Sequence, residues 1–387
     1  MKESICFVLR GLGLGGVERA LVALANQLID NYDVTVVLFN HKDNALIYDL
    51  DDKVNIVLLS RKAMNYCIAD KDNRAGLSKK FQIYKAFIRL LTKMKIKKSY
   101  EKAVFKKCRA MEYDYVISYA GFPGPWDTVA ELIKAKNRFA FVHNNPVSLG
   151  MQKYDLKEYY RCFDKIVCVS KDIQSKICSL DSRISSKVCV AYNVVDHDKI
   201  RELSSECVDY DSDAKLIVTV ARLENQAKRL DRVIEAVDIL VKRGYSSFEW
   251  HIVGDGADRA KLEQLVRDKK LEKYILFEGF SLNPYKYISR AYIFALTSDY
   301  EGLPVTLMES QCLRVPAVVT DFSCASEIVF DGYNGYVVEK DASHIADKIA
   351  YLLDNAEIRE TLAENALVSY NNLADNSEVS FNRLFSF

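Results

Sequence analysis

Residues 4–39 read SICFVLRGLGLGGVERALVALANQLIDNYDVTVVLF, and their pattern of apolar residues and glycines indicates the fold. Ser4–Leu9 is an apolar run that ends in the glycine turn Gly11–Gly16. Val17–Asp30 then places apolar residues at 17, 20, 21, 24 and 28, the spacing of a helix with one buried face. Val34–Phe39 is a second apolar run. Strand, turn, helix and strand form a βαβ unit, which predicts a parallel sheet covered by helices.

The same alternation continues along the chain and restarts after a polar stretch. With 387 residues the chain is long enough for two domains. The further strands that we expect are 114–118, 140–143, 165–169, 187–191, 215–220, 248–253, 274–277, 292–296, 316–319 and 335–338. We predict an N-terminal Rossmann-like domain over 1–195, a boundary region over 196–213, a C-terminal Rossmann-like domain over 214–368 and a last helix over 369–387. Doubly wound domains bind ligands at the carboxyl ends of their strands, so we expect a cleft there.

The composition is that of a globular protein in a reducing compartment. Hydrophobic residues make up 49% of the chain and charged residues 28%. No run of about 18 uncharged apolar residues suggests a membrane span, and the N-terminus reads as a strand and not as a signal peptide. Ten cysteines include no CxxC pair, so we expect no zinc site and no disulfides. We therefore predict a cytoplasmic protein.

The most informative segment for function is Thr297–Ser310, TSDYEGLPVTLMES. It follows an apolar strand and leads into a helix, with Pro304 expected in the first helical turn. The backbone amides of Gly302, Leu303 and Val305 would then lie at a helix start, where unpaired N–H groups favour an anion. The two glutamates of the segment suit sugar hydroxyls better than phosphate: they are Glu301, in the loop, and Glu309, expected about two turns into the helix.

A second segment, Val220–Ala236, supplies cations. Arg222 stands at the end of a strand, and Lys228 is expected to open a helix. Departure of a nucleotide diphosphate leaves negative charge on phosphate, and fixed cations stabilise that charge as it develops. Arginine can bind two phosphate oxygens at once, and lysine supplies a point charge. This pair predicts phosphate stabilisation without a metal ion.

Other loops at strand ends carry weaker signals. Gly15 and Gly16 close a glycine turn that lets a ligand approach the backbone, although its spacing is not that of a dinucleotide site. His143 ends an apolar strand, and Gly254 follows another. The DLD sequence at 49–51 resembles a metal-binding motif, but no strand precedes it. We therefore predict no metal site.

Together these motifs resemble the retaining GT-B glycosyltransferases of family 4. The likeness rests on GLGLGGVERALVALA, VARLENQAKRLD, IVGDGADRAKLE and SDYEGLPVTLMES, and it is strongest from about 215 to 340. It implies two Rossmann-like domains facing each other across a cleft. It also implies that the last helix crosses back to the first domain. The activity implied is transfer from a nucleotide-diphosphate sugar with retained configuration, the leaving phosphate serving as base.

The resemblance also implies roles for single residues. Glu301 would bind hydroxyls of the donor sugar, Glu309 the ribose, and Arg222 with Lys228 the diphosphate. Further donor contacts would come from the amides of Leu303 and Val305 beside Gly302, and from Gly15, Gly16 and Gly254, while His143 would lie near the reacting sugar. The spacing from Arg222 differs from the family pattern because Ala227 looks inserted. Either Lys228 or Arg229 is therefore left as the phosphate ligand.

Residues 79–109 are strongly basic, with twelve lysines and arginines and one acid, Glu101. Aromatic and aliphatic residues recur among the lysines at helical spacing, at 81, 84, 87, 88 and 91. A basic amphipathic helix of this kind is typical of attachment to an anionic membrane surface. The alternative is a helix that packs its apolar face on the first domain. Nothing else in the chain suggests nucleic acid as a partner.

The sequence favours a hexosyl- or N-acetylhexosaminyltransferase that uses a UDP-sugar in preference to GDP-mannose. A glycan acceptor, lipid-linked and part of a surface polysaccharide such as lipopolysaccharide or capsule, fits this reading, as does peripheral attachment to the inner face of the membrane. Two alternatives stay open: a UDP-sugar epimerase of the same architecture, and a non-catalytic nucleotide- or glycan-binding relative. No cofactor is expected beyond the donor itself.

Overall fold

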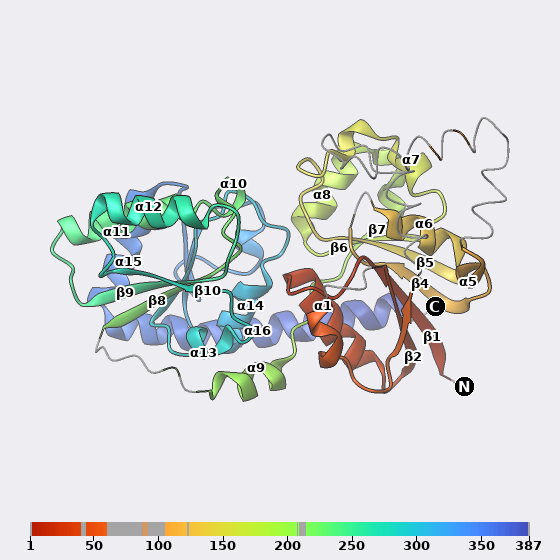
Figure 1. Ribbon diagram of the computed structural model, residues 1–387, viewed down its shortest axis with the longest axis horizontal. Coiled ribbons are helices and arrows are strands. Elements are labelled where there is room, and N and C mark those ends of the chain that lie inside the picture. The colour runs from red at the N-terminus through yellow and green to blue at the C-terminus, as the bar shows by residue number, and fades with distance from the viewer. Residues whose placement is uncertain are drawn as a thin grey trace. The chain divides into compact units, whose positions relative to one another are not determined.

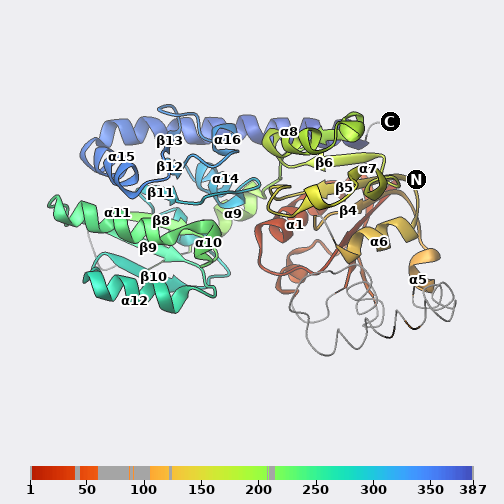
Figure 2. The ribbon, with the colours of Figure 1, turned by 90° about the horizontal axis from the view of Figure 1, so that it is seen from above.

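The computed structural model describes residues 2–39, 44–59, 87, 90, 105–121, 124–206, 208 and 214–385. The chain divides into two compact units, Met1–Val194 and Val195–Phe387 (Figure 1). Each unit is a parallel sheet with helices on its faces, which is plain when the ribbon is turned to the second view (Figure 2).

The first unit contains a seven-stranded sheet with the order β3-β2-β1-β4-β5-β6-β7. All neighbouring strands run parallel, and β1 pairs with β2 along its whole length, from Glu3 opposite Tyr32 to Leu9 opposite Leu38. The strands are β1 (Glu3–Leu9), β2 (Tyr32–Leu38), β3 (Asn55–Leu58), β4 (Glu112–Ser118), β5 (Lys134–Val142), β6 (Lys165–Cys168) and β7 (Val188–Val190). The direction of winding reverses between β1 and β4, and the carboxyl ends of such strands are the usual place for a ligand in an open parallel sheet.

Short helices connect these strands. Helix α1 (Gly16–Leu28) buries seven alanine, leucine and valine residues against the sheet, which explains its helical spacing of apolar residues. The others are η1 (Ala45–Asp49), α5 (Lys106–Arg109), α6 (Pro125–Leu132), η2 (Met151–Lys153), α7 (Leu156–Tyr159), α8 (Lys171–Leu180) and η3 (Ser182–Lys187).

The second unit repeats the plan with a six-stranded parallel sheet of order β10-β9-β8-β11-β12-β13. Here the winding reverses between β8 and β11. The strands are β8 (Lys215–Val220), β9 (Phe248–Val253), β10 (Ile275–Gly279), β11 (Ile293–Leu296), β12 (Ala317–Thr320) and β13 (Gly335–Val338).

The helices of the second unit enclose one apolar core around the fully buried Trp250. They are α9 (His197–Ser204), α10 (Asn225–Lys228), α11 (Leu230–Lys242), α12 (Arg259–Lys269), α13 (Tyr285–Ile288), α14 (Val305–Cys312), η4 (Ala325–Glu327), α15 (Ala342–Asp354) and α16 (Ala356–Phe385). The stretch 196–213, taken from the sequence as a boundary, thus contains α9. Residues 369–385 continue a helix that already begins at Ala356.

Most strands were predicted within one or two residues, since buried parallel strands are continuous apolar runs. Two differences stand out. Strand β3 was not predicted, because only one of its four residues is buried. Strand β5 begins at Lys134 and not at 140, because the start of this strand carries the polar sequence KAKNR.

Candidate functional site

The site residues of the second unit gather at the carboxyl edge of its sheet. Strands β8 and β11 are neighbours, with Ile217 opposite Ile293. The chain leaves β8 two residues before Arg222 and leaves β11 directly into Thr297. This is the point where the winding of the sheet reverses, the usual place for a ligand in an open parallel sheet.

Lys228 and Glu301 lie in direct contact at this edge. The Nζ atom of Lys228 is 2.6 Å from Oε1 of Glu301, and the hydroxyl of Ser298 donates to the same oxygen at 2.6 Å. The two charged side chains are 24% and 11% exposed, so the pair is largely shielded from water. Two residues 73 positions apart, predicted separately to bind phosphate and sugar, are thus brought together.

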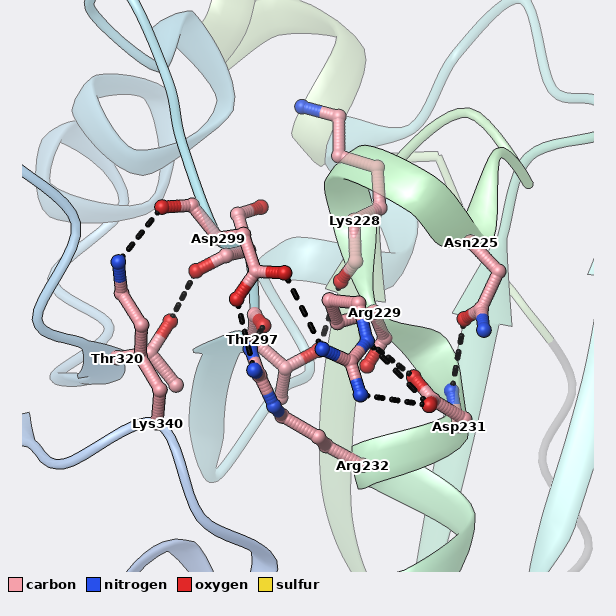
Figure 3. Close-up of polar contacts among 10 residues, drawn as sticks. Asn225, Lys228, Arg229, Asp231, Arg232, Thr297, Asp299, Thr320 and Lys340 are labelled. Carbon is pink, nitrogen blue, oxygen red and sulfur yellow. Dashed lines mark hydrogen bonds and ion pairs between the residues drawn. The ribbon is translucent and has the colours of Figure 1, made fainter.

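Lys228 is the last residue of α10 and does not open a helix, which corrects the prediction. The chain breaks at Arg229, which adopts a left-handed backbone (φ 49°, ψ 49°), and α11 begins at Leu230. The guanidinium of Arg229 is bound to the carboxylates of Asp231 and Asp299, whereas Lys228 extends away from that cluster (Figure 3). The guanidinium of Arg229 is thus paired with two carboxylates and the ammonium of Lys228 with that of Glu301, and which of the two residues binds phosphate stays a prediction.

Arg222 follows β8 at the same edge and is largely exposed. Its nearest charged partner is Glu224, at 3.1 Å, and both side chains remain about half exposed or more. An ion pair this exposed contributes little stability. The guanidinium can therefore turn to a bound anion at small cost.

The loop between β11 and α14 presents backbone to this edge. Pro304 is the N-cap of α14 and not a residue of its first turn, a shift of one position, and no side chain caps the helix. Leu303 and Val305 bury their side chains, so only their backbone groups are left to meet a ligand. With Gly302 they stand at a helix start without a side-chain cap, and the anion site that the sequence predicts there stays a prediction.

Glu309 is buried inside the second unit. It is the fifth residue of α14, little more than one turn from the start and not two as predicted. Its Oε1 accepts a hydrogen bond of 3.0 Å from the hydroxyl of Tyr285 on α13. A buried carboxylate needs such donors, because an unpaired charge in the interior is costly. No pattern in the sequence pointed to Tyr285, which lies 24 residues away in a different helix.

Gly254 has a packing role in the structure. Its backbone has φ 143°, which side chains rarely adopt, and a Cβ atom there would overlap the carbonyl oxygen of Ala221. The amide of Ala221 donates to the carbonyl of Val253 at 3.1 Å, so the ends of β8 and β9 lie tightly together. Glycine at 254 thus sets the backbone from which Arg222 projects.

In the first unit, Gly15 and Gly16 stand where β1 gives way to α1. Gly15 is the N-cap in extended conformation, and no side chain caps the helix. A Cβ at Gly15 would meet the carboxylate of Glu18. The carboxylate of Glu18 thus lies at the N-terminus of α1, the end of a helix that favours negative charge, and the assignment of Gly15 and Gly16 to the donor site stays a prediction.

His143 directly follows β5 and is buried. Its ring lies 4.6 Å from that of Tyr119 and 5.8 Å from that of Phe141, measured between centroids. Neither ring nitrogen makes a hydrogen bond of normal geometry. Burial lowers the pKa of His143 to about 4, and the backbone of Tyr119 opposes this only in part. The ring is neutral at physiological pH.

This burial predicts an acid-sensitive stability. Between pH 6.5 and about 4, His143 is protonated in the unfolded chain but not in the folded chain. The free energy of unfolding therefore falls as the pH falls. The loss is about 3 kcal/mol over the whole window. We expect His143→Phe to flatten the pH dependence, measured by urea unfolding at pH 7 and 4.5. His344→Phe, at an exposed histidine, is the control and should follow the wild type; identical profiles for both variants would refute the assignment.

Other sequence signals have structural explanations or lie outside the described residues. In the DLD sequence, Asp51 accepts a hydrogen bond from the amide of Lys53, and its own amide donates to the side chain of Asn26.

Among the described residues no group of acidic, cysteine or histidine side chains could hold a metal, and the described cysteines are free thiols. Most of the basic segment 79–109 is not described. No helix of the described ranges is long and apolar enough to cross a bilayer.

Part of the chain is similar to known glycosyltransferases. Residues 201–368 match the family described as glycosyl transferases group 1. An N-acetylgalactosaminyltransferase of Campylobacter jejuni that acts on a diphospho-undecaprenol glycan is 25% identical over 94% of both chains. The poly(ribitol-phosphate) α-N-acetylglucosaminyltransferase of Staphylococcus aureus is 29% identical over 40% of this chain. The chain spans between 32 and 59% of the length of four curated relatives that it matches.

A solved structure extends the likeness to the whole fold. Anabaena HepE, determined with UDP and glucose, superposes over 100% of both chains with a TM-score of 0.73 at 17% identity. The predicted α/β class, two doubly wound Rossmann-like units, is thus confirmed, and the fold is that of the GT-B glycosyltransferases.

Proposed function

We propose that the chain transfers a hexose or an N-acetylhexosamine from a nucleotide-diphosphate sugar, a UDP-sugar in preference to GDP-mannose, to a glycan acceptor. The observation that carries this proposal is the contact of Lys228 with Glu301 at the carboxyl edge of β8 and β11. One cation and one acid at that edge match the two ends of a diphosphate sugar. The names of the relatives, which include transferases for a diphospho-undecaprenol glycan and for poly(ribitol-phosphate), support a bacterial surface polysaccharide as the acceptor class.

We further propose that the reaction is of the family 4 type, with retained configuration and without a metal. Arg222 and Lys228 would stabilise charge on the leaving diphosphate, the task that a divalent cation performs in other transferases. Glu301 would bind hydroxyls of the sugar, and Glu309 those of the ribose. No side chain is needed as nucleophile if the leaving phosphate accepts the proton of the acceptor hydroxyl. His143, neutral and buried, suits a position beside an uncharged sugar better than one beside phosphate.

The test begins with a thermal-shift screen of nucleotide sugars, because a ligand that binds the folded state raises the midpoint. The best donor is then incubated with glycan acceptors, with and without EDTA, and the products are analysed. A new α-linked glycoside, formed equally with EDTA, supports the proposal. A changed free nucleotide sugar would indicate an epimerase. Binding without any product, unaltered in Glu301→Ala, would indicate a non-catalytic relative.

Arg222→Ala is expected to lower kcat for this transfer about 100-fold while the fold survives, since the arginine acts on charge that develops in the transition state. Glu224→Ala is the matched control, because it removes the ion-pair partner of Arg222 without removing the cation. Steady-state kinetics of both variants decide the matter. Wild-type turnover in Arg222→Ala would contradict the role.

We also propose that residues 79–109 hold the protein on the inner face of the membrane, where a lipid-linked acceptor is found. The support is their charge, with twelve basic residues against Glu101. Exchange of Lys93, Lys95, Lys97 and Lys98 for glutamate should release the protein from anionic vesicles in a sedimentation assay. Vesicle binding equal to that of the wild type would remove this segment as an anchor.

A further inference from the structure

The junction between α10 and α11 contains an unusual arginine. Arg229 has φ 49°, a left-handed backbone conformation that is uncommon for residues other than glycine, asparagine and aspartate. It lies directly after Lys228, so its backbone sets the direction in which Lys228 leaves α10. A strained residue persists only where its surroundings hold it in place.

The side chain of Arg229 supplies that hold. Its guanidinium donates to Asp231 at 3.0 and 2.9 Å and to Asp299 at 3.2 Å. Asp231 lies in the first turn of α11, whereas Asp299 lies in the loop after β11, two residues before Glu301. The arginine thus joins the helix junction to the loop that carries the acid of the site (Figure 3).

A second, buried arginine also binds the carboxylate of Asp299. Nη2 of Arg232, a buried side chain on α11, lies 2.7 Å from its carboxylate, and Nη1 of the same residue donates to the carbonyl of Thr297 at 3.0 Å. Burial alone would raise the pKa of Asp299, but hydrogen bonds from Arg232 and Arg229 overcome it and lower the pKa below its ordinary value. The carboxylate of Asp299 is therefore charged at neutral pH.

Hydrogen bonds to backbone carbonyls also link the end of α10 to the loop after β11. The amide of Asp299 donates to the carbonyl of Ala227 at 2.9 Å, and the hydroxyl of Thr297 donates to the carbonyls of Lys228 and Arg229 at 3.0 Å each. Lys340 donates to the carbonyl of Asp299 at 2.8 Å. These bonds fix the position of the loop after β11 relative to the end of α10. The 2.6 Å contact of Lys228 with Glu301 joins the same two segments.

We propose that Arg229 and Asp299 form a clamp that positions Lys228 and Glu301 for a diphosphate sugar, an inference that rests on the function proposed above. Neither clamp residue needs to touch the ligand. Arg229 is thereby a positioning residue, and its guanidinium does not serve as a second phosphate ligand. A displacement of about 1 Å at a reacting group can cost about 100-fold in rate, which gives the clamp its value.

Arg229→Gly separates the two contributions of the arginine. Glycine adopts the left-handed backbone freely, so this variant keeps the turn and loses only the guanidinium. Asp299→Asn removes the charge at the other end of the clamp with little change in volume. Arg243→Gly and Asp347→Asn are matched controls, because they break an exposed ion pair of 2.6 Å elsewhere in the second unit. Wild type, four single variants and the double variant of the clamp are compared in donor kinetics, in UDP binding and in urea unfolding.

We expect Arg229→Gly and Asp299→Asn each to lower kcat/KM for the donor about tenfold, with the double variant no worse than the poorer single one. UDP should bind about tenfold more weakly to each, because Lys228 is no longer held in place. The controls should match the wild type. A variant that is merely less stable would change the unfolding midpoint but keep its kcat.

If Arg229→Gly has the kinetics and the UDP affinity of the wild type, the proposed clamp is wrong. Position 229 then matters only for its left-handed backbone. Losses that multiply in the double variant would also overturn it, because two residues that act as one unit do not have additive effects. If the wild type transfers no sugar at all, the proposed function fails. The affinity of the same variants for UDP then still decides whether the clamp positions Lys228.

Discussion

Lys228→Ala is expected to lower kcat between about 100- and 1000-fold, the usual cost of removing one fixed group that stabilises developing charge. The ammonium lies 2.6 Å from Glu301 in a contact that is mostly shielded from water, where electrostatic interactions are stronger than at the surface. Its loss therefore removes from the leaving diphosphate a cation that is already held at the site. Single-turnover kinetics with saturating donor measure the effect on the chemical step.

Two further variants control this experiment. Lys228→Arg keeps a positive charge and should retain more activity than the alanine variant, though less than the wild type, because the guanidinium is larger and differently shaped. Lys242→Ala removes an exposed lysine of the same unit and should change nothing. A kcat within twofold of wild type in Lys228→Ala would show that the lysine has no part in the reaction.

Gly254→Ala is expected to destabilise the second unit by about 3 to 5 kcal/mol. The added methyl group would overlap the carbonyl oxygen of Ala221, and φ 143° is a backbone conformation that alanine hardly populates. The overlap involves backbone on both sides, so no side chain can turn away to relieve it. Urea unfolding followed by tryptophan fluorescence is a suitable measurement, because Trp250 is buried in the core of this unit.

Gly244→Ala provides the comparison. Gly244 also has positive φ, at 93°, but a Cβ there would meet nothing within 4 Å. This variant should cost only about 1 to 2 kcal/mol, the backbone strain alone. Equal losses in the two variants would show that the contact with Ala221 does not matter, and that Gly254 is required for its backbone conformation only.

The fold could be predicted from the sequence because each of its signals is local. Buried strands are apolar runs, helices repeat every three to four residues, and glycines mark strand ends. The same holds for Glu301 and the helix start beside it, which lie within one short segment. Lys228 was identified from its spacing to Arg222, but its place at the end of α10 was not.

The residues that hold the site in place could not be predicted in this way. Asp299 is bound by Arg229 and Arg232, from a segment about 70 positions earlier, and Glu309 by Tyr285 from another helix. Such pairs leave no pattern in a single sequence, since each partner alone looks like an ordinary surface charge or core aromatic. The left-handed backbone of Arg229 was equally hidden, because glycine is the residue expected at such a turn.

The contact between Lys228 and Glu301 also has a consequence for turnover. In the proposed cycle an arriving donor separates the two side chains: its phosphates take the ammonium and its hydroxyls take the carboxylate. After the sugar is transferred, the nucleotide diphosphate has no sugar hydroxyl to bind the carboxylate of Glu301. That carboxylate then competes with the phosphates for the ammonium of Lys228. The ion pair of the empty site thereby favours release of the nucleotide product. We expect the dissociation constant of a UDP-sugar, measured by calorimetry, to be lower than that of UDP.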